Sequence, residues 1–235
     1  MKYIFDVDGT LTPSRGKMNQ HLAPWFENFA THNDVYLVTG SDREKTLEQI
    51  PEYIYNLCNT VYQCSGNDIW CGEVNLKTYP FNIPDELYQD LIDELEHSTF
   101  NIKTGQHIDE RIGLTNFSVV GRNATFEERF LYKQWDEHKN ERIHIAHRLR
   151  SKWPDINFQI AGETGIDITA KGSNKAQILK DFSITDTIYF FGDNCQFGGN
   201  DHEIAVAIND LENNSRVFEV NDWEHTWKLL KELSA

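Results

Sequence analysis

The stretch Lys2-Tyr3-Ile4-Phe5-Asp6-Val7-Asp8-Gly9 joins a short apolar run to two acidic residues and a glycine. The run has the length of a buried strand and ends at the first aspartate. Two further runs of this kind lie later in the chain: Val35–Val38 before Thr39-Gly40-Ser41, and Ile188–Phe191 before Gly192-Asp193. Each run precedes a stretch with helical spacing, and unbroken apolarity is typical of parallel strands covered on both faces. The sequence therefore predicts an α/β fold around a parallel sheet.

The ends of these runs predict a binding site, because ligands in open α/β sheets bind beyond the carboxyl ends of the strands. Asp6 and Asp8 are two residues apart on extended backbone and so point to the same side, and Gly9 allows a sharp turn after them. Two close carboxylates raise each other's pKa unless a cation lies between them, and Mg²⁺ prefers such oxygen ligands. A polar strand end beside a turn is the alternative explanation.

A second acidic and glycine-rich segment follows the third apolar run. Asp193 comes directly after that run and is placed to complete the oxygen shell of a metal ion. Asn200 and Asp201 follow closely, where they would orient that ligand or a metal-bound water. The alternative is a glycine-rich loop whose polar residues cap the next helix.

The middle of the chain predicts an α+β unit inserted into the α/β domain. The predicted elements are a helix over Pro84–His97, extended chain over Arg111–Val120, one long amphipathic helix over Phe126–Trp153, and a hairpin over Asn157–Thr169 that turns at Gly162–Gly165. The expected buried positions of the long helix are Phe126, Phe130, Trp135, Ile143, Ala146 and Leu149. We place the domain boundaries so that residues 1–79 and 173–235 form the α/β domain and residues 80–172 the inserted unit.

Composition excludes several classes of function. The 235-residue chain has 37 acidic and 22 basic residues and a net charge of −15, which argues against a broad nucleic-acid or anionic-membrane surface. An anionic substrate would then be held by a few local Arg, Lys or metal charges. No apolar run approaches the roughly 18 residues of a membrane span. The apolar start is too short for a secretion signal, and the four cysteines form no CxxC pair, so a cytoplasmic protein with unpaired thiols is expected.

Taken together and in order, four segments resemble the four motifs of the haloacid dehalogenase superfamily of phosphotransferases: Asp6–Thr12, Thr39–Ser41, Lys175 and Gly192–Asp201. The inserted unit falls between the second and third motifs, where a type-two cap would lie. Further segments resemble the eukaryotic-type phosphomannomutase family: Asp6–Thr12 with Arg15, Gly40-Ser41-Asp42, Tyr189–Asp193, Gly198–Ile204 and the stretch Asn116–Arg129. The resemblance implies a Rossmann-like core with an inserted α+β cap domain.

The resemblance also implies an activity and its cofactors. Members of this family interconvert mannose 6-phosphate and mannose 1-phosphate, which serves GDP-mannose biosynthesis. The implied route runs through an aspartyl phosphate and a hexose 1,6-bisphosphate, which is also the implied activator. Mg²⁺ is the implied metal, a phosphorylated hexose the implied partner, and a homodimer through the cap domain the implied assembly. Neither a nucleic-acid nor a membrane partner is implied.

Residue roles are carried over from the family in the same way. Asp6 is similar to the nucleophile and Asp8 to the general acid/base, while Lys175, Ser41 and Thr39 match the groups that bind the transferred phosphoryl. The implied metal ligands are Asp6, Asp193 and Asp8, the last through its backbone carbonyl, with Asp201 beside them. The implied substrate-binding residues are Arg15, Arg111, Arg122, Arg129 and Asp167. Guanidinium groups suit that task because they grip phosphate bidentately.

The sequence departs from the family at several positions. Gly165 stands where a serine is usual near the sugar, and Asn174 precedes Lys175 where an aspartate is usual. Ala205 and Ala207 occupy positions around the family's second, structural cation. The departures at 165 and 174 favour the first alternative function, a Mg²⁺-dependent sugar-phosphate phosphatase on the same scaffold. A non-enzymatic acidic scaffold protein with a decayed site is the second alternative.

Overall fold

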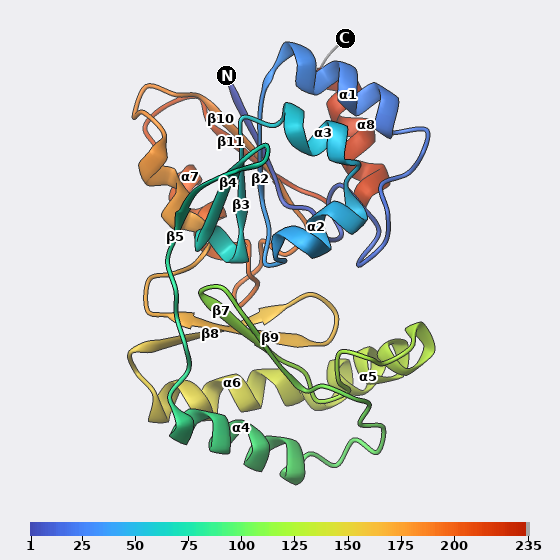
Figure 1. Ribbon diagram of the computed structural model, residues 1–235, viewed down its shortest axis with the longest axis vertical. Helices are drawn as coiled ribbons and strands as arrows, with labels where there is room; N and C mark the ends of the chain where they lie inside the picture. The colour runs from blue at the N-terminus through green and yellow to red at the C-terminus, as the bar shows by residue number, and fades with distance from the viewer. Residues whose placement is uncertain (234–235) are drawn as a thin grey trace. The chain divides into compact units, whose positions relative to one another are not determined.

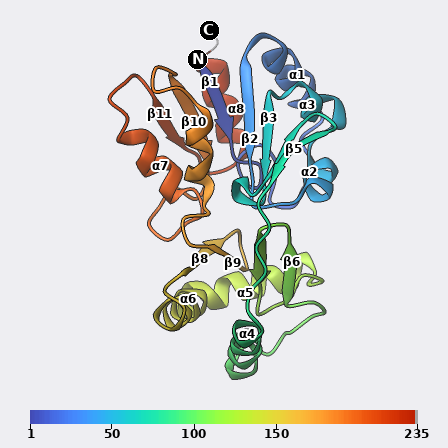
Figure 2. The same ribbon diagram turned by 60° about the vertical axis from the view of Figure 1, so that its left-hand side comes forward.

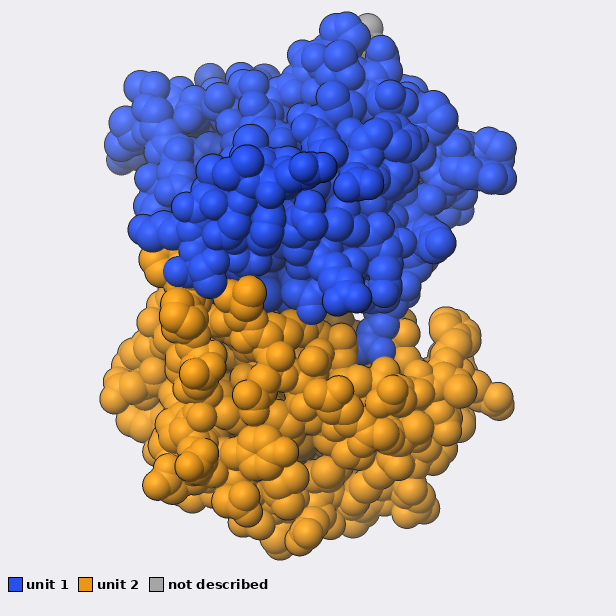
Figure 3. Space-filling view, viewed as in Figure 1, with its two compact units in different colours: residues 1–78, 174–235 blue, residues 79–173 orange. Residues whose placement is uncertain are grey.

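The computed structural model describes residues 1–233, and the chain divides into two compact units, shown in different colours in Figure 3. The core unit comprises residues 1–78 and 174–235, and the inserted unit comprises residues 79–173. Each unit has its own buried apolar cluster. The chain therefore contains two separate hydrophobic cores.

A seven-stranded sheet forms the centre of the core unit, with the order β11-β10-β1-β2-β3-β4-β5 (Figure 1). Its strands are β1 (Lys2–Phe5), β2 (Asp34–Val38), β3 (Thr60–Gln63), β4 (Asp68–Cys71), β5 (Val74–Thr78), β10 (Ile188–Gly192) and β11 (Arg216–Glu219). The first five strands of that order are parallel, whereas β4 and β5 pair antiparallel. The three apolar runs form the neighbouring strands β10, β1 and β2, which confirms the predicted α/β fold.

Helices cover both faces of this sheet (Figure 2). The helices are α1 (Ala23–His32), α2 (Arg43–Gln49), α3 (Glu52–Leu57), α7 (His202–Asn209) and α8 (Trp223–Leu233), and two 3-10 segments span Cys64–Gly66 and Lys175–Asp181. Phe26 of α1, Ile54 of α3 and Leu230 of α8 pack in one buried cluster with Phe5 and Phe191 of the sheet. The packing explains why these strands are apolar without alternation.

The inserted unit is a four-stranded antiparallel sheet with the order β6-β7-β9-β8 and helices on one face (Figure 1). Its elements are α4 (Asp85–His97), β6 (Ile108–Arg111), β7 (Leu114–Phe117), α5 (Phe126–Lys139), α6 (Glu141–Lys152), β8 (Ile156–Ala161) and β9 (Gly165–Ala170). Phe117, Phe158 and Ile168 of the strands pack against Tyr132 and Leu149 of the helices. The opposite face of the sheet carries several polar side chains, among them Asn116, Gln159 and Asp167. The predicted helix at Pro84–His97 and the predicted hairpin are confirmed.

The prediction of one long helix over Phe126–Trp153 is wrong. The segment forms two helices, α5 and α6, because Asn140 adopts a left-handed conformation with φ 53° between them. A residue in that region interrupts the helical hydrogen-bond pattern, and asparagine tolerates it better than most side chains. The break also changes which face is buried.

Three of the predicted buried positions of that segment are exposed, namely Phe126 (78%), Phe130 (50%) and Ile143 (54%). Ala146 and Leu149 are buried as predicted, and Trp135 is half-buried. The buried face of α5 instead carries Arg129, Tyr132 and Asp136. Hydrophobic spacing misplaced this face because two of its three members are charged. No helix within residues 1–233 combines the length and apolarity that crossing a membrane requires.

Candidate active site

The carboxyl ends of β1 and β10 bring Asp6 and Asp193 together. Asp6 is buried at the end of β1, and Asp193 follows the last residue of β10. Gly9 has φ +80°, and a Cβ at this position would lie 2.4 Å from Oδ2 of Asp193. The glycine thus allows both the turn after Asp8 and the close approach of the two strand ends.

Lys175 lies fully buried between two carboxylates. Its Nζ atom donates to Oδ1 of Asp6 at 2.6 Å and to Oδ1 of Asp201 at 2.7 Å. Burial alone would lower the pKa of Lys175, but the charges of Asp201 and Asp6 and their hydrogen bonds raise the pKa above its ordinary value. The ammonium group therefore stays protonated. Asn174 holds the start of this segment, because its Oδ1 accepts from the backbone N–H of Ala176.

Three carboxylates form one acidic group around this lysine. Ligand oxygens of Asp6, Asp193 and Asp201 all lie within 4.8 Å of one another. Burial, together with the charges of Asp201 and Asp193, raises the pKa of Asp6 well above its usual value although Lys175 opposes the shift. Burial and the charge of Asp201 likewise raise the pKa of Asp193 to about 7.

One ammonium group does not balance three carboxylates. The remaining negative charge, concentrated on oxygen atoms at one point, suits a hard divalent cation. The group could therefore bind a metal ion.

The carboxylate of Asp8 has different partners and stands apart from the acidic group. Its Oδ1 atom accepts from the backbone N–H of Arg15 at 2.6 Å and from Nε2 of Gln49 at 2.9 Å. Its Oδ2 atom accepts from Oγ of Ser41 at 3.4 Å. The side chain of Asp8 is thus oriented by hydrogen bonds from Arg15, Gln49 and Ser41.

The buried residues Thr39 and Ser41 are fixed by the loop that follows β3. Oγ1 of Thr39 accepts from the N–H of Ser41, while the carbonyl groups of Thr39 and Ser41 accept from the N–H groups of Ser65 and Cys64. Asp42, the next residue, caps α2 by accepting from the backbone N–H of Lys45.

In the inserted unit, Asp109 joins two of the candidate arginines. Its Oδ2 atom accepts from Nε and Nη2 of Arg111 at 2.9 and 2.7 Å, and from Nε of Arg122 at 3.1 Å. Arg129 pairs with a different carboxylate, donating from Nη2 to Glu163 at 2.6 Å. A single carboxylate, that of Asp109, thus holds the guanidinium groups of Arg111 and Arg122 near one another.

Asp167 lies on β9 of the same unit and is buried. Its Oδ1 atom accepts from Nδ2 of Asn116 at 2.7 Å. A Cβ at Gly165 would lie 2.6 Å from that same Nδ2 atom. The absence of a side chain at position 165 therefore makes room for the amide that holds Asp167.

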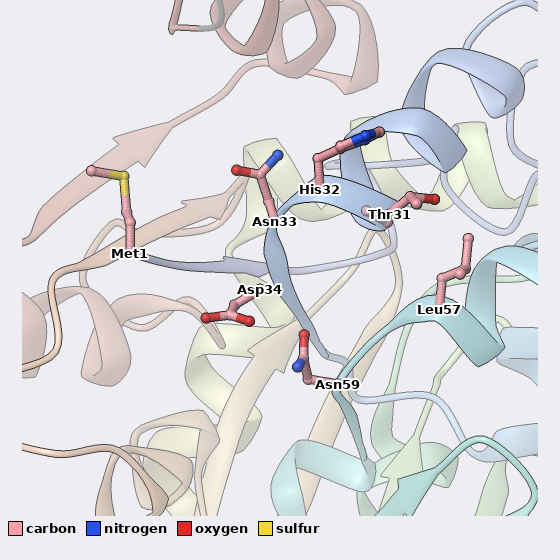
Figure 4. A pocket seen from close by; sticks show the side chains of 8 residues that line it. Met1, Thr31, His32, Asn33, Asp34, Leu57 and Asn59 are labelled. Atoms are coloured by element: carbon pink, nitrogen blue, oxygen red, sulfur yellow. The ribbon is translucent and has the colours of Figure 1, made fainter.

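A pocket elsewhere on the core unit does not belong to this site (Figure 4). It is lined by Met1, Ala30, Thr31, His32, Asn33, Asp34, Leu57 and Asn59. Met1 and Asp34 mark the amino ends of β1 and β2, which are parallel. The pocket lies at the edge of the sheet opposite to Asp6.

The family model of eukaryotic phosphomannomutase matches residues 22–233. The chain belongs to the eukaryotic phosphomannomutase family. It is 32% identical over 214 residues to the phosphomannomutase of Triticum aestivum, covering 86% of this chain and 84% of the relative. The phosphomannomutase of Schizosaccharomyces pombe is also 32% identical, over 216 residues, with the same coverage of 86% and 84%.

Solved structures show the same fold at lower sequence similarity. A haloacid dehalogenase-like hydrolase from Bacteroides thetaiotaomicron matches with a TM-score of 0.58 at 12% identity, and the match covers 98% of both chains. The phosphomannomutase-family chain thus has the haloacid dehalogenase core with an inserted cap.

Two side chains that contact the candidate residues of this family member were absent from the sequence-based prediction. Gln49, at the end of α2, is buried and donates from Nε2 to both Asp8 and Oγ1 of Thr12. Asp109 holds Arg111 and Arg122. A polar residue on a short helix and an acid in an alternating strand carry no sequence signal of their own, because tertiary packing alone brings them to their partners.

Proposed function

We propose that this chain is a phosphomannomutase that interconverts mannose 6-phosphate and mannose 1-phosphate through an aspartyl phosphate on Asp6 and a hexose 1,6-bisphosphate. The observation that carries the proposal is the buried contact of Asp6 with Lys175 inside a group of three carboxylates. Family membership supplies the substrate class.

In the first half-reaction, a carboxylate oxygen of Asp6 bonds to phosphorus while the bond between phosphorus and a sugar oxygen breaks. Asp8 gives a proton to the departing sugar oxygen and later removes a proton from the hydroxyl that takes the phosphoryl group back. The hydrogen bonds from Gln49 and Arg15 to Asp8 support this role, since they fix the carboxylate in one orientation. Lys175, Ser41 and Thr39 bind the phosphoryl oxygens.

The oxygen-rich donor set fits Mg²⁺. Asp6 and Asp193, with the backbone carbonyl of Asp8, would hold the ion, and Asp201 would orient them while it bonds to Lys175. When bound, Mg²⁺ offsets the negative charge of the transferring group. The raised pKa values of Asp6 and Asp193 support a cation here, because burial and the charge of neighbouring carboxylates raise both of them although Lys175 opposes the shift.

Substrate recognition falls to the arginines and to Asp167. Arg15, Arg111, Arg122 and Arg129 bind the phosphate that does not react, and Asp167 binds the sugar. The pairing of Arg111 and Arg122 on one carboxylate supports this assignment, because it presents two guanidinium groups at a single place. Hexose 1,6-bisphosphate acts as the activator because it transfers a phosphoryl group to Asp6.

A homodimer through the inserted unit rests on the family resemblance. A cytoplasmic location is favoured by four free cysteines, which suit a reducing compartment.

The test is an isomerisation assay read by phosphorus NMR. The protein is incubated with mannose 1-phosphate, Mg²⁺ and a trace of hexose 1,6-bisphosphate, and mannose 6-phosphate is the expected product. Asp6→Asn is expected to abolish it, because the amide cannot form the acyl phosphate. Release of inorganic phosphate without isomer would overturn the proposal in favour of a sugar-phosphate phosphatase.

A further inference from the structure

A row of polar side chains crosses the sheet of the inserted unit. The antiparallel register places Asp109 opposite Asn116, Asn116 opposite Asp167, and Asp167 opposite Gln159. Directly opposite residues of antiparallel strands project on the same face. These four side chains therefore lie side by side on one face of the sheet.

The other face of the sheet fixes this orientation. Phe158 and Ile160 flank Gln159 on β8, and both pack in the apolar cluster beneath the helices. Because side chains alternate along a strand, Gln159 must project away from that cluster. It is thus held on the polar face next to Asp167.

Gln159 differs from the other members of the row in its partners. Asp109 bonds to two arginines, and Asn116 bonds to Asp167. Gln159 is 8% exposed, and its side-chain amide makes no hydrogen bond to another residue within 1–233. The amide of Gln159 therefore has both its donors and its acceptor available to a ligand at this face of the sheet.

The surroundings of Asp167 identify the kind of ligand. The side-chain amide of Asn116 lies beside Asp167, in space that a side chain at position 165 would occupy. Gln159 lies on the other side of Asp167, across from it on β8. An amide both donates and accepts, and a carboxylate accepts, so the pair matches neighbouring hydroxyl groups.

We propose that Gln159 binds hydroxyl groups of the hexose ring and contributes to the choice between mannose and glucose phosphates. The inference rests on the proposed function, in which Asp167 binds the sugar. The two hexoses differ in the direction of a single hydroxyl group. A site built to hydrogen-bond a hydroxyl discriminates strongly against a sugar that leaves its polar groups unpaired.

The experiment compares wild type with Gln159→Leu, which keeps the approximate size of the side chain but removes both amide groups. Values of kcat/KM are measured with mannose 1-phosphate and with glucose 1-phosphate, in the presence of Mg²⁺ and hexose 1,6-bisphosphate. We expect a loss of about tenfold for the preferred hexose, mainly in KM, and a change of at least about threefold in the ratio of the two kcat/KM values. Gln134→Leu, at an exposed position of α5, is the matched control and should leave both values unchanged.

The ratio separates recognition from stability, because a structural defect lowers activity with both hexoses alike. An unchanged ratio, with or without loss of activity, overturns the inference. Where Gln159→Leu does not fold, Gln159→Glu keeps the shape, removes the amide donors and adds a carboxylate opposite Asp167, and it must change the same ratio. A wild-type protein that releases phosphate without isomer overturns the proposed function instead.

Discussion

Lys175 is the residue on which the charge balance of the candidate site depends. Its ammonium group bonds to Asp6 and Asp201 in a fully buried position. We expect Lys175→Met to lower the free energy of unfolding by about 3–5 kcal/mol, because it leaves two buried carboxylates without a partner. Isomerase activity should fall by roughly 10²–10³ through loss of a donor to the phosphoryl group. Urea unfolding followed by circular dichroism measures the first effect.

The control for that substitution is Lys180→Met, at an exposed position of the same 3-10 segment. It should change the free energy of unfolding by less than about 0.5 kcal/mol. A Lys175→Met protein as stable as the control at pH 8 would contradict the assigned ion pairs of Lys175 with Asp6 and Asp201.

Asp6 and Asp193 make the stability of the metal-free protein depend on pH. Both pKa values are raised in the fold, that of Asp193 to about 7, so the folded state holds more protons than the unfolded state between about pH 4 and pH 7. Stability from a raised carboxyl pKa is present at low pH and is lost as pH rises through the folded value. We therefore expect the Tm in EDTA to fall between pH 5 and pH 8.

Mg²⁺ should reverse this trend, because it binds the ionised carboxylates and stabilises the folded state by mass action. Asp193→Asn isolates the effect, since the variant lacks one of the two titrating groups. Its Tm in EDTA should fall less steeply with pH, and Mg²⁺ should raise it less. Parallel pH profiles for wild type and variant would show that Asp193 does not titrate in this range.

Among the secondary-structure elements, strands were easier to predict from the sequence than helix faces. The runs at β1, β2 and β10 are buried on both faces, so an unbroken apolar run and its polar end are visible directly. For the same reason the sequence could place Asp6 and Asp193 near one another. In α5 the buried face includes Arg129 and Asp136, which no hydrophobic pattern can reveal.

Contacts between elements were the part that the sequence could not supply. Gln49 meets Asp8 across 41 positions of sequence, and Arg129 meets Glu163 across 34. Neither pair has a spacing that a helix or strand would repeat. Such contacts depend on the packing of the whole unit, and sequence patterns report only local periodicity.

The break between α5 and α6 can be tested by making its sequence more helical. Asn140 has φ 53°, where a Cβ is unfavourable for most residues. Alanine favours a continuous helix, so Asn140→Ala should destabilise the protein by about 1 kcal/mol, whereas Asn140→Gly should not. Glu137→Ala, at an exposed position of α5, is the control for helix propensity. A stabilised Asn140→Ala protein would favour the single helix instead.

The two units of the molecule carry different parts of the proposed reaction. The three carboxylates of the acidic group and Lys175 all belong to residues 1–78 and 174–235. Arg111, Arg122, Arg129, Asp167 and Gln159 all belong to residues 79–173. Phosphoryl transfer is thus assigned to the core unit and most of the substrate recognition to the inserted unit, and each unit has its own hydrophobic core.

This division predicts how the whole chain unfolds. Because each unit has its own apolar cluster, calorimetry should resolve two transitions, and residues 79–173 expressed alone should unfold cooperatively at the Tm of one of them. Mg²⁺ should raise the Tm of the other transition alone, because all three carboxylates that would bind it lie in the core unit. A single transition whose Tm rises with Mg²⁺ would mean that the two cores unfold as one cooperative unit. Metal binding in the core unit would then also stabilise the inserted unit, which carries most of the proposed substrate-binding residues.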